Sequence, residues 1–360
     1  MLQLQSISLV QFRNYVQQQF AFTEKVVGIC GLNGSGKTNL LDAIYYLGFT
    51  KSYFSKNDAQ NVHHGLAGMR LQGHFLLGNE PQNLLCILRE NNKKEFSVND
   101  EPYKKFSEHI GRFPCVMIAP DDVELIIGGS EERRKFIDTL LSQIDKTYLQ
   151  QLIDYTKILQ QRNSLLKQAA EQGRMDEALL QIFNEQLSQK GEWVYQQRTI
   201  FLQEFLLLTI DFYKRIAGKE DAVTIAYESG LQQTNMQQLL QAAKQKDMVL
   251  QRTTVGIHKD DLAIKMGDNN FKNEASQGQR KSLLFALKLA EWQTLKNKKG
   301  FTPILLLDDV FEKLDEQRMH NLLQWVCTED DGQVFITDTH ASRLEQQLNA
   351  INIKYQLIEL

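Results

Sequence analysis

The chain has 360 residues, of which 42% are hydrophobic and 24% charged, and a formal net charge of −3 at pH 7. This length favours more than one domain, and the nearly balanced charge means that any nucleic-acid-binding surface has to be a local patch. No apolar run approaches the ~20 residues that span a bilayer and no signal peptide is present, so we expect a soluble, cytoplasmic protein without membrane contacts. Zinc and disulfide chemistry are not expected, because the four cysteines lie in separate apolar runs without a Cys-x-x-Cys pair: Cys30, Cys86, Cys115 and Cys327.

The N-terminal stretch alternates apolar and polar residues, as strands with one buried face do. Ile7 to Phe12 and Gln18 to Phe22 flank a polar turn, so we expect them to pair as a hairpin. Val26 to Cys30 is apolar throughout and predicts a buried strand. An antiparallel layer is therefore expected ahead of the motif that follows.

A glycine-rich loop with the spacing of a phosphate-binding loop comes directly after the buried strand, and an amphipathic segment, Asn39 to Leu47, follows it. Backbone N–H groups at the start of a helix favour a phosphate, and so does the positive end of the helix dipole. Lys37 is expected to reach the β- and γ-phosphates of ATP, and the Thr38 hydroxyl to ligate Mg²⁺. The expected ATP-binding residues are Gly31, Leu32, Asn33, Gly34, Ser35, Gly36, Lys37, Thr38 and Asn39.

Beyond this helix, the polar segment Lys51 to Asp58 is either a loop near a ligand or a solvated linker. Turn signals then separate several short apolar runs, which predicts a meandering β-layer and one further buried strand. These strands are expected at Met69 to Leu77, Leu84 to Glu90, Glu95 to Val98 and Phe113 to Ile118.

A helical region is expected from Ser130, a candidate N-cap, to about Ala217. Apolar residues recur at helical spacing there and no proline occurs. Glu171 to Gly173 interrupts the pattern, so we predict two long helices folded back on each other.

Strand character returns at Val223 to Tyr227 and at Thr253 to Met266, after a helical stretch around Met236 to Ala243. The run Gly256 to Asp261 is unusually polar for a strand margin. Within it, His258 is either a ligand or relay residue or a satisfied structural histidine.

Ser276, Gln277, Gly278 and Gln279 open a further helix with an apolar face. A helix that begins with small residues offers a second anion site. Ile304 to Leu307 then predicts a buried parallel strand that ends in two carboxylates.

Phosphoryl transfer needs one carboxylate for Mg²⁺ and gains from a second that polarises water. We assign Asp308 to the metal and Asp309 to the attacking water. A helix at Glu316 to Val326 and a strand at Gln333 to Thr337 follow, and the strand ends at Asp338, Thr339 and His340.

These motifs, in this order, resemble the ABC-type ATPase heads of chromosome and repair proteins and, within that group, the RecF family of bacterial recombination mediators. Two features depart from the family pattern. The signature motif is Ala-Ser-Gln-Gly-Gln here, in place of the transporter-like Leu-Ser-Gly-Gly-Gln. The stretch Cys115 to Asp121 takes the place of the loop that usually joins the head to the helical lobe, and it lacks the glutamine expected there. The residues that carry the resemblance include Phe12-Arg13-Asn14-Tyr15, Lys51-Ser52, Pro120 to Glu124, Gly129, Arg133 to Asp138, Gly256-x-His258-Lys259-Asp260-Asp261 and Ser276-x-Gly278-Gln279.

The resemblance implies an α/β fold: a P-loop ABC/SMC-type ATPase head, with a mixed sheet and an antiparallel β-layer, that carries an inserted α-helical lobe. The expected domains are 1–124 and 251–360 for the head and 125–250 for the lobe. Ser276 to Gln279 of a second subunit would contact ATP, so that ATP joins a homodimer and slow, DNA-stimulated hydrolysis releases it. His340 or Asp338 would be the switch residue.

By the same resemblance, the dimer clamps double-stranded DNA near single-strand/double-strand junctions, and works with RecO and RecR in replication, recombinational gap repair and the SOS response. Each basic residue of the lobe is either a DNA contact or part of a solvated face, and Arg133 and Arg134 could also pair with Glu131, Asp138 or a partner subunit. The DNA-contact candidates are Arg133, Arg134, Lys135, Lys157, Arg162, Lys167, Lys214 and Arg215.

A transport ATPase subunit or a chromosome tether is the alternative. The sequence does not favour a transport ATPase subunit, because the full Leu-Ser-Gly-Gly-Gln motif of that class is missing. It does not favour a chromosome tether either, because the insertion between the two halves of the head is far too short for a long coiled coil.

Overall fold

The computed structural model describes residues 1–218, 221–310, 316–329 and 331–360. The chain divides into two compact units. The head unit comprises Met1–Val123, Asp211–Glu220 and Ser276–Leu360, and the lobe unit comprises Glu124–Ile210 and Asp221–Ala275. Residues 251–275, which we assigned to the head, pack within the lobe unit; the domain bounds themselves stay a prediction.

The head unit contains a five-stranded parallel sheet with the strand order β14-β3-β13-β12-β8. Its central strands are buried along their whole length, as expected for a parallel sheet that is covered on both faces. Because the strands are parallel, the loops that leave their carboxyl ends meet at one edge of the sheet. The strands are β3 (Val26–Cys30), β8 (Cys115–Ile118), β12 (Ile304–Leu307), β13 (Val334–Asp338) and β14 (Tyr355–Glu359).

A six-stranded antiparallel sheet with the order β2-β1-β4-β5-β6-β7 forms a second layer of the head unit. The predicted N-terminal hairpin and the meander that follows are both confirmed, with bounds that differ by a few residues. The strands are β1 (Leu2–Phe12), β2 (Tyr15–Ala21), β4 (Met69–Leu77), β5 (Glu80–Leu88), β6 (Lys94–Val98) and β7 (Glu101–Pro102).

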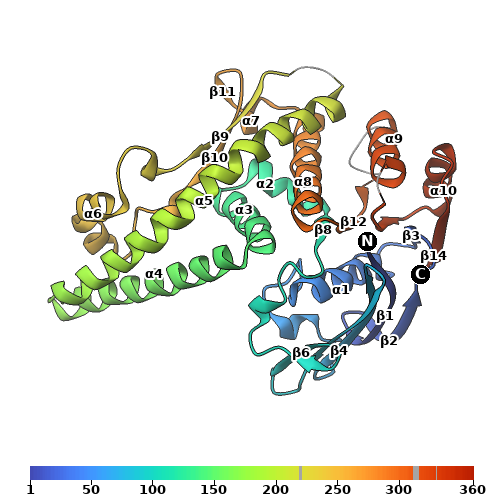
Figure 1. Ribbon diagram of the computed structural model, residues 1–360, viewed down its shortest axis with the longest axis horizontal. Coiled ribbons are helices and arrows are strands. Elements are labelled where there is room, and N and C mark those ends of the chain that lie inside the picture. The colour runs from blue at the N-terminus through green and yellow to red at the C-terminus, as the bar shows by residue number, and fades with distance from the viewer. Residues whose placement is uncertain (219–220, 311–315, 330) are drawn as a thin grey trace. The chain divides into compact units, whose positions relative to one another are not determined.

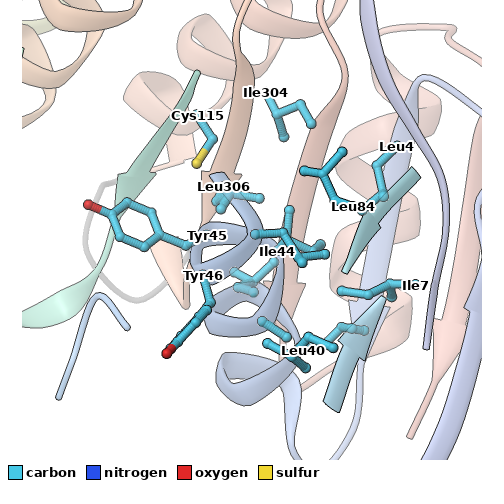
Figure 2. Close-up of a cluster of buried hydrophobic side chains, with 14 of the residues drawn as sticks. Leu4, Ile7, Leu40, Ile44, Tyr45, Tyr46, Leu84, Cys115, Ile304 and Leu306 are labelled. Atoms are coloured by element: carbon cyan, nitrogen blue, oxygen red, sulfur yellow. The ribbon is translucent and has the colours of Figure 1, made fainter. Parts of the chain in front are cut away.

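The helix α1 (Lys37–Phe49) belongs to the buried core that both sheets share. Figure 2 shows Leu40 of α1 near Ile7 of β1, and Ile44 of α1 near Leu306 of β12, and all four residues are at most 1% exposed. Burial of a leucine or isoleucine side chain contributes about 1.5–3 kcal/mol. This packing fixes the first turn of α1 relative to the carboxyl ends of the parallel strands.

The head unit also contains the helices α8 (Gln277–Lys299), α9 (Glu316–Gln324) and α10 (Ala341–Ala350). A π-helical turn, Trp325–Glu329, follows α9. The strand β14 and the helix α10 were not predicted, although Leu344 and Leu348, both fully buried, have the i, i+4 spacing of a helix face.

The lobe unit combines helices with a three-stranded antiparallel sheet of order β11-β10-β9. In Figure 1, α4 (green) and α5 (yellow-green) are two long helices that lie close together at their left-hand ends and then diverge. No helix within the described ranges is long and apolar enough to cross a membrane. The elements are α2 (Glu124–Ile127), α3 (Ser130–Ile144), α4 (Lys146–Gln172), α5 (Glu177–Ala217, of which the residues after Ile210 lie in the head unit), α6 (Met236–Leu250), α7 (Phe271–Glu274), β9 (Val223–Glu228), β10 (Asp261–Met266) and β11 (Asn269–Asn270).

Two sequence-based expectations about the lobe are wrong. The predicted first long helix is broken at Asp145, which has an extended backbone and accepts a hydrogen bond from Thr147 N, so it caps α4. The predicted strand Thr253 to Met266 begins only at Asp261, because Gly256 (φ 112°) starts a 3₁₀ turn, Ile257–Lys259. All four cysteines are buried and free, in agreement with their positions in apolar runs.

Candidate nucleotide-binding site

The glycine-rich loop connects β3 to α1, and Gly36 is the residue that precedes the helix. Its φ of 116° lies in the region that only glycine adopts without strain. A Cβ at this position would lie 2.6 Å from Asn14 Nδ2 and 2.7 Å from Tyr15 Oη. Both backbone conformation and space therefore require glycine here.

The turn between β1 and β2 holds the loop through its backbone carbonyls. Asn14 Nδ2 donates to the Ser35 carbonyl at 3.0 Å, and the Tyr15 hydroxyl donates to the Gly36 carbonyl at 3.1 Å. Asn39 Nδ2 in turn donates to Asn14 Oδ1 at 2.7 Å. The motif Phe12-Arg13-Asn14-Tyr15 thus has a physical role, because its last two residues orient two peptide groups of the loop.

Lys37 is 4% exposed, and its ammonium group lies against the loop itself. Its Nζ donates to the carbonyls of Gly31 at 2.8 Å and Leu32 at 3.2 Å. The Ser35 hydroxyl oxygen is buried and has no hydrogen-bond partner in the described part of the chain. A cation and an unsatisfied hydroxyl beside the N-terminus of a helix fit a phosphate group.

Asp308 follows β12, and its carboxylate contacts the first turn of α1 directly after the glycine-rich loop. The Thr38 hydroxyl lies 3.0 Å from both of its carboxylate oxygens, and the Thr337 hydroxyl donates to Oδ1 at 2.9 Å. Burial raises the pKa of Asp308 to about 6 and the Asp309 charge adds to this, while the two hydroxyls and Lys37 act in the opposite direction. A buried carboxylate beside a threonine hydroxyl is a suitable pair of oxygen ligands for Mg²⁺.

Asp309 has a left-handed backbone with φ 46°, which is uncommon for a residue other than glycine. Its N–H donates to the Thr337 hydroxyl at 2.8 Å, and its side chain is half-buried. Backbone strain of this kind is concentrated at functional sites.

The two candidates for a switch residue, Asp338 and His340, lie at the end of β13. Arg343 donates to the fully buried Asp338 carboxylate from Nε at 2.8 Å and from Nη2 at 2.5 Å. His340 is exposed, and its backbone N–H donates to Asp338 Oδ1 at 3.0 Å. The Asp338 carbonyl accepts from Gly31 N at 3.3 Å, so Asp338 is tied to the start of the loop.

Ser276 to Gln279 form the N-terminus of α8. The Ser276 hydroxyl accepts from Gln279 N at 3.2 Å, and Gln279 Oε1 accepts from Ser276 N at 2.9 Å, which is a complete capping box. Ser276 and Gln277 are exposed. The capping box explains the local pattern, and contact with a second subunit stays a prediction. Leu314 and Asp315, whose Leu-Asp pair also belongs to the resemblance, lie outside the described residues.

The basic candidates of the lobe differ in their partners. Arg133 makes a two-point contact with Asp261 at 2.6 and 2.9 Å, and Arg134 Nη1 donates to the Asp260 carbonyl at 2.6 Å. Lys135 is exposed and lies 3.9 Å from Glu132. DNA contact by these three residues stays a prediction.

Arg162 is fully buried and paired with Asp247 at 2.8 Å, so the expectation that it touches DNA is wrong. His258 lies within hydrogen-bond distance of the Tyr155 hydroxyl, at 2.8 Å, and of the Thr253 carbonyl, at 3.1 Å. Burial lowers the pKa of His258 to about 4. These contacts favour the structural reading of this histidine.

Sequence reasoning missed two residues that contact acidic side chains at the sheet edge, Thr337 and Arg343. Thr337 acts on Asp308, which only the sheet register brings near, whereas Arg343 acts on Asp338, five positions earlier in the chain. A polar residue at the carboxyl end of a predicted buried strand was the available signal for Thr337.

Comparisons with known proteins agree with this geometry. The family model described as RecF/RecN/SMC N terminal domain matches residues 3–357. The chain is 42% identical to the DNA replication and repair protein RecF of Flavobacterium johnsoniae, over 99% of both chains. It is 41% identical to that of Phocaeicola vulgatus, over 98% of this chain and 95% of the relative.

Solved structures extend the comparison to the fold. The recombination mediator protein RecF with ATPrS, described as part of the RecFOR pathway, is 31% identical and superposes with a TM-score of 0.87, over 95% of this chain and 93% of that one. The Smc head domain of Pyrococcus furiosus, at 14% identity and a TM-score of 0.55 over 99% of this chain and 93% of that one, shares the fold alone. With a matching family model and full-length relatives at about 40% identity, the chain belongs to the RecF family of ABC/SMC-type ATPase heads.

Proposed function

We propose that this chain is an ATP-dependent DNA-binding protein of replication and recombinational repair, in which MgATP closes a homodimer on double-stranded DNA near single-strand gaps. The contact of Thr38 with Asp308 carries the nucleotide part, because it joins the glycine-rich loop to the acidic strand end. The repair context comes from the RecF relatives, and the RecFOR pathway named for the solved RecF structures suggests RecO and RecR as partners.

Each part of the site has a distinct task in this proposal. The loop N–H groups and Lys37 bind the phosphates, and Thr38 and Asp308 hold Mg²⁺. Asp309 orients or deprotonates the attacking water, so it acts in the hydrolytic step only. Bound MgATP supplies the transferable phosphoryl group and the metal charge that neutralises it.

The exposed Ser276 and Gln277 at the start of α8 are proposed to contact the nucleotide of a second subunit. One subunit then lacks part of the site, which makes dimerisation depend on ATP. Slow hydrolysis, stimulated by DNA, would separate the two heads.

The test measures molecular mass by light scattering, with and without MgATP and a gapped duplex. We expect the parent to dimerise with ATP and Lys37→Ala to stay monomeric, because the triphosphate charge is then under-compensated. Asp309→Asn should keep the ATP affinity, lower the turnover by about 10²–10⁴ and accumulate as a dimer with a longer residence time on duplex DNA.

Asp308→Asn serves as the matched comparison, because it changes the neighbouring carboxylate by the same single atom. It should weaken nucleotide binding itself, since it removes charge from the metal site. If Asp309→Asn stays monomeric with ATP while Asp308→Asn dimerises normally, the two roles are assigned the wrong way round. If Lys37→Ala dimerises with ATP and holds duplex DNA as the parent does, the coupling of ATP to DNA binding is absent.

A further inference from the structure

The hydroxyl of Thr337 lies between the two consecutive acidic residues of the site. It donates to Asp308 Oδ1 at 2.9 Å and accepts from Asp309 N at 2.8 Å. Thr337 is fully buried on β13, which pairs in parallel with β12. One oxygen atom therefore links the side chain of one carboxylate residue to the backbone of the next.

The direction of the Thr337 hydroxyl hydrogen follows from this arrangement. A hydroxyl has one hydrogen to donate, and Asp309 N–H already occupies an acceptor position on the oxygen. The hydrogen is thus directed at Asp308, and the burial of Thr337 excludes solvent as a competing partner. The Asp308 carboxylate is held from one side by β13 and from the other by Thr38 of α1.

The second bond acts on the backbone of Asp309. A non-glycine residue at φ 46° is held there by its surroundings, and the Thr337 hydroxyl accepts the N–H of this strained peptide. Since the backbone angle at Asp309 sets the direction in which its side chain leaves, the position of the second carboxylate depends on the same hydroxyl.

We propose that Thr337 is a positioning residue for ATP hydrolysis, which fixes Asp308 and Asp309 relative to each other from the neighbouring strand. The inference rests on the proposed function, in which Asp308 serves the metal and Asp309 the water. Because Thr38 still holds Asp308 when the Thr337 hydroxyl is removed, nucleotide binding should persist. A small misplacement of a reacting group costs up to about 10² in rate, so the effect should fall on turnover.

The central variant is Thr337→Val, which keeps the branched shape of the side chain and removes the hydroxyl. We expect kcat for ATP hydrolysis to fall about 10- to 100-fold, with the dissociation constant for ATP, from calorimetry, changed less than about 3-fold. Thr337→Ser restores the hydroxyl and should recover kcat to within about 3-fold of the parent.

The chain offers a matched control in Thr302, a buried threonine of the same unit. Thr302 is 1% exposed, and its hydroxyl also donates to an aspartate, Asp331, at 2.6 Å. It precedes β12, whereas Thr337 and Asp308 lie at the carboxyl ends of their strands. Thr302→Val should lower the melting temperature to an extent similar to Thr337→Val and leave kcat unchanged.

Three results would decide the matter. A fall of kcat in Thr337→Val, with rescue by serine and no change in Thr302→Val, supports the positioning role. Parent-like kcat in Thr337→Val, or an equal fall in Thr302→Val, overturns it and leaves the proposed function intact. A parent protein that binds no ATP overturns both.

Discussion

The lobe unit and the candidate nucleotide site of the head unit both bury charged side chains, but they compensate these charges in different ways. In the lobe unit, Arg198 contacts Asp138 at 2.8 Å and Asp260 at 3.0 Å, and Arg162 pairs with Asp247. In the head unit, Lys37 contacts backbone carbonyls and Asp308 contacts threonine hydroxyls. These lobe charges are thus neutralised by opposite charges, whereas Lys37 and Asp308 are held by neutral dipoles. Elsewhere in the head unit, the buried Asp338 pairs with Arg343.

This difference separates two polar motifs that look alike in sequence. The segment Gly256 to Asp261 is as dense in polar residues as the glycine-rich loop, yet Asp260 is bound by Arg198 and the Tyr227 hydroxyl, and Asp261 by Arg133. Buried charges that already have opposite charges as partners stabilise an arrangement of helices and strands. Charges held by dipoles alone keep the capacity to bind an ion of opposite sign.

The largest expected effect tests the internal pairing of the lobe. Arg198→Met leaves Asp138 and the buried Asp260 without their cation, so unfolding by urea should show a loss of about 3–5 kcal/mol. Lys244→Met removes an exposed partner of Glu177 in the same unit and should cost about 0–1 kcal/mol. Equal losses in the two variants would mean that the buried pairing contributes nothing beyond a surface pair.

A smaller effect on stability should follow pH, because burial lowers the pKa of both His258 in the lobe and His109 in the head to about 4. Below pH 6.5 the unfolded chain binds a proton that the folded chain does not, so stability falls as the pH drops from 6.5 towards 4. Each histidine should account for about 2 kcal/mol between pH 6.5 and pH 5.

The measurement compares urea unfolding at these two pH values for the parent and for His258→Gln and His109→Gln. Each variant should lose its share of the pH dependence. If His258→Gln keeps the full slope of the parent, the buried neutral state of this histidine is contradicted.

A still smaller effect is expected for the hydroxyl that orients the loop of the head unit. Tyr15→Phe removes the hydrogen bond to the Gly36 carbonyl, worth about 1 kcal/mol, and should weaken ATP binding by about 3- to 10-fold in calorimetry. Tyr46→Phe, which removes a hydroxyl of α1 that donates to Asp58, is the control and should keep the parent's affinity. If both variants lose the same ATP affinity, the hydrogen bond from Tyr15 to the loop contributes nothing specific to ATP binding.

The smallest effect concerns DNA binding by the lobe. Lys135→Ala and Arg134→Ala should each lower the salt slope of duplex binding by about 1, if each side chain neutralises one phosphate. Arg133→Ala should leave the slope unchanged, because Asp261 already compensates its charge. Filter binding at several salt concentrations measures the slope. If the slope falls only in Arg133→Ala, the assignment of DNA contacts to Lys135 and Arg134 is contradicted.

Local patterns were sufficient to predict the features of the head that lie within one short segment. The β3 strand, the glycine-rich loop and α1 follow one another directly, and the carboxylates of Asp308 and Asp309 follow an uninterrupted apolar run. Their proximity was also predictable, since parallel strands end at one edge of the sheet.

Features that depend on register or on a single capping side chain were not predictable in the same way. The contact of Thr337 with Asp308 requires β13 to lie beside β12, and the sequence does not state this order. The break at Asp145 depends on one side chain that caps α4 in the middle of an unbroken apolar periodicity. The pairing of Arg133 with Asp261 joins residues separated by 128 positions.

The position of β3 has a consequence for synthesis on the ribosome. Val26–Cys30 lies between β13 and β14, strands that are translated about three hundred residues later, and Leu4 N donates to Gln333 Oε1 across a separation of 329 residues. The nascent chain therefore carries the glycine-rich loop on an unpaired, fully apolar strand while the lobe is being made. Pairings of such sequence separation form slowly and leave hydrophobic edges exposed in the meantime. The parallel sheet beside the glycine-rich loop is thus completed only after β13 and β14 have been translated, and a chain released before that point would expose an unpaired apolar strand.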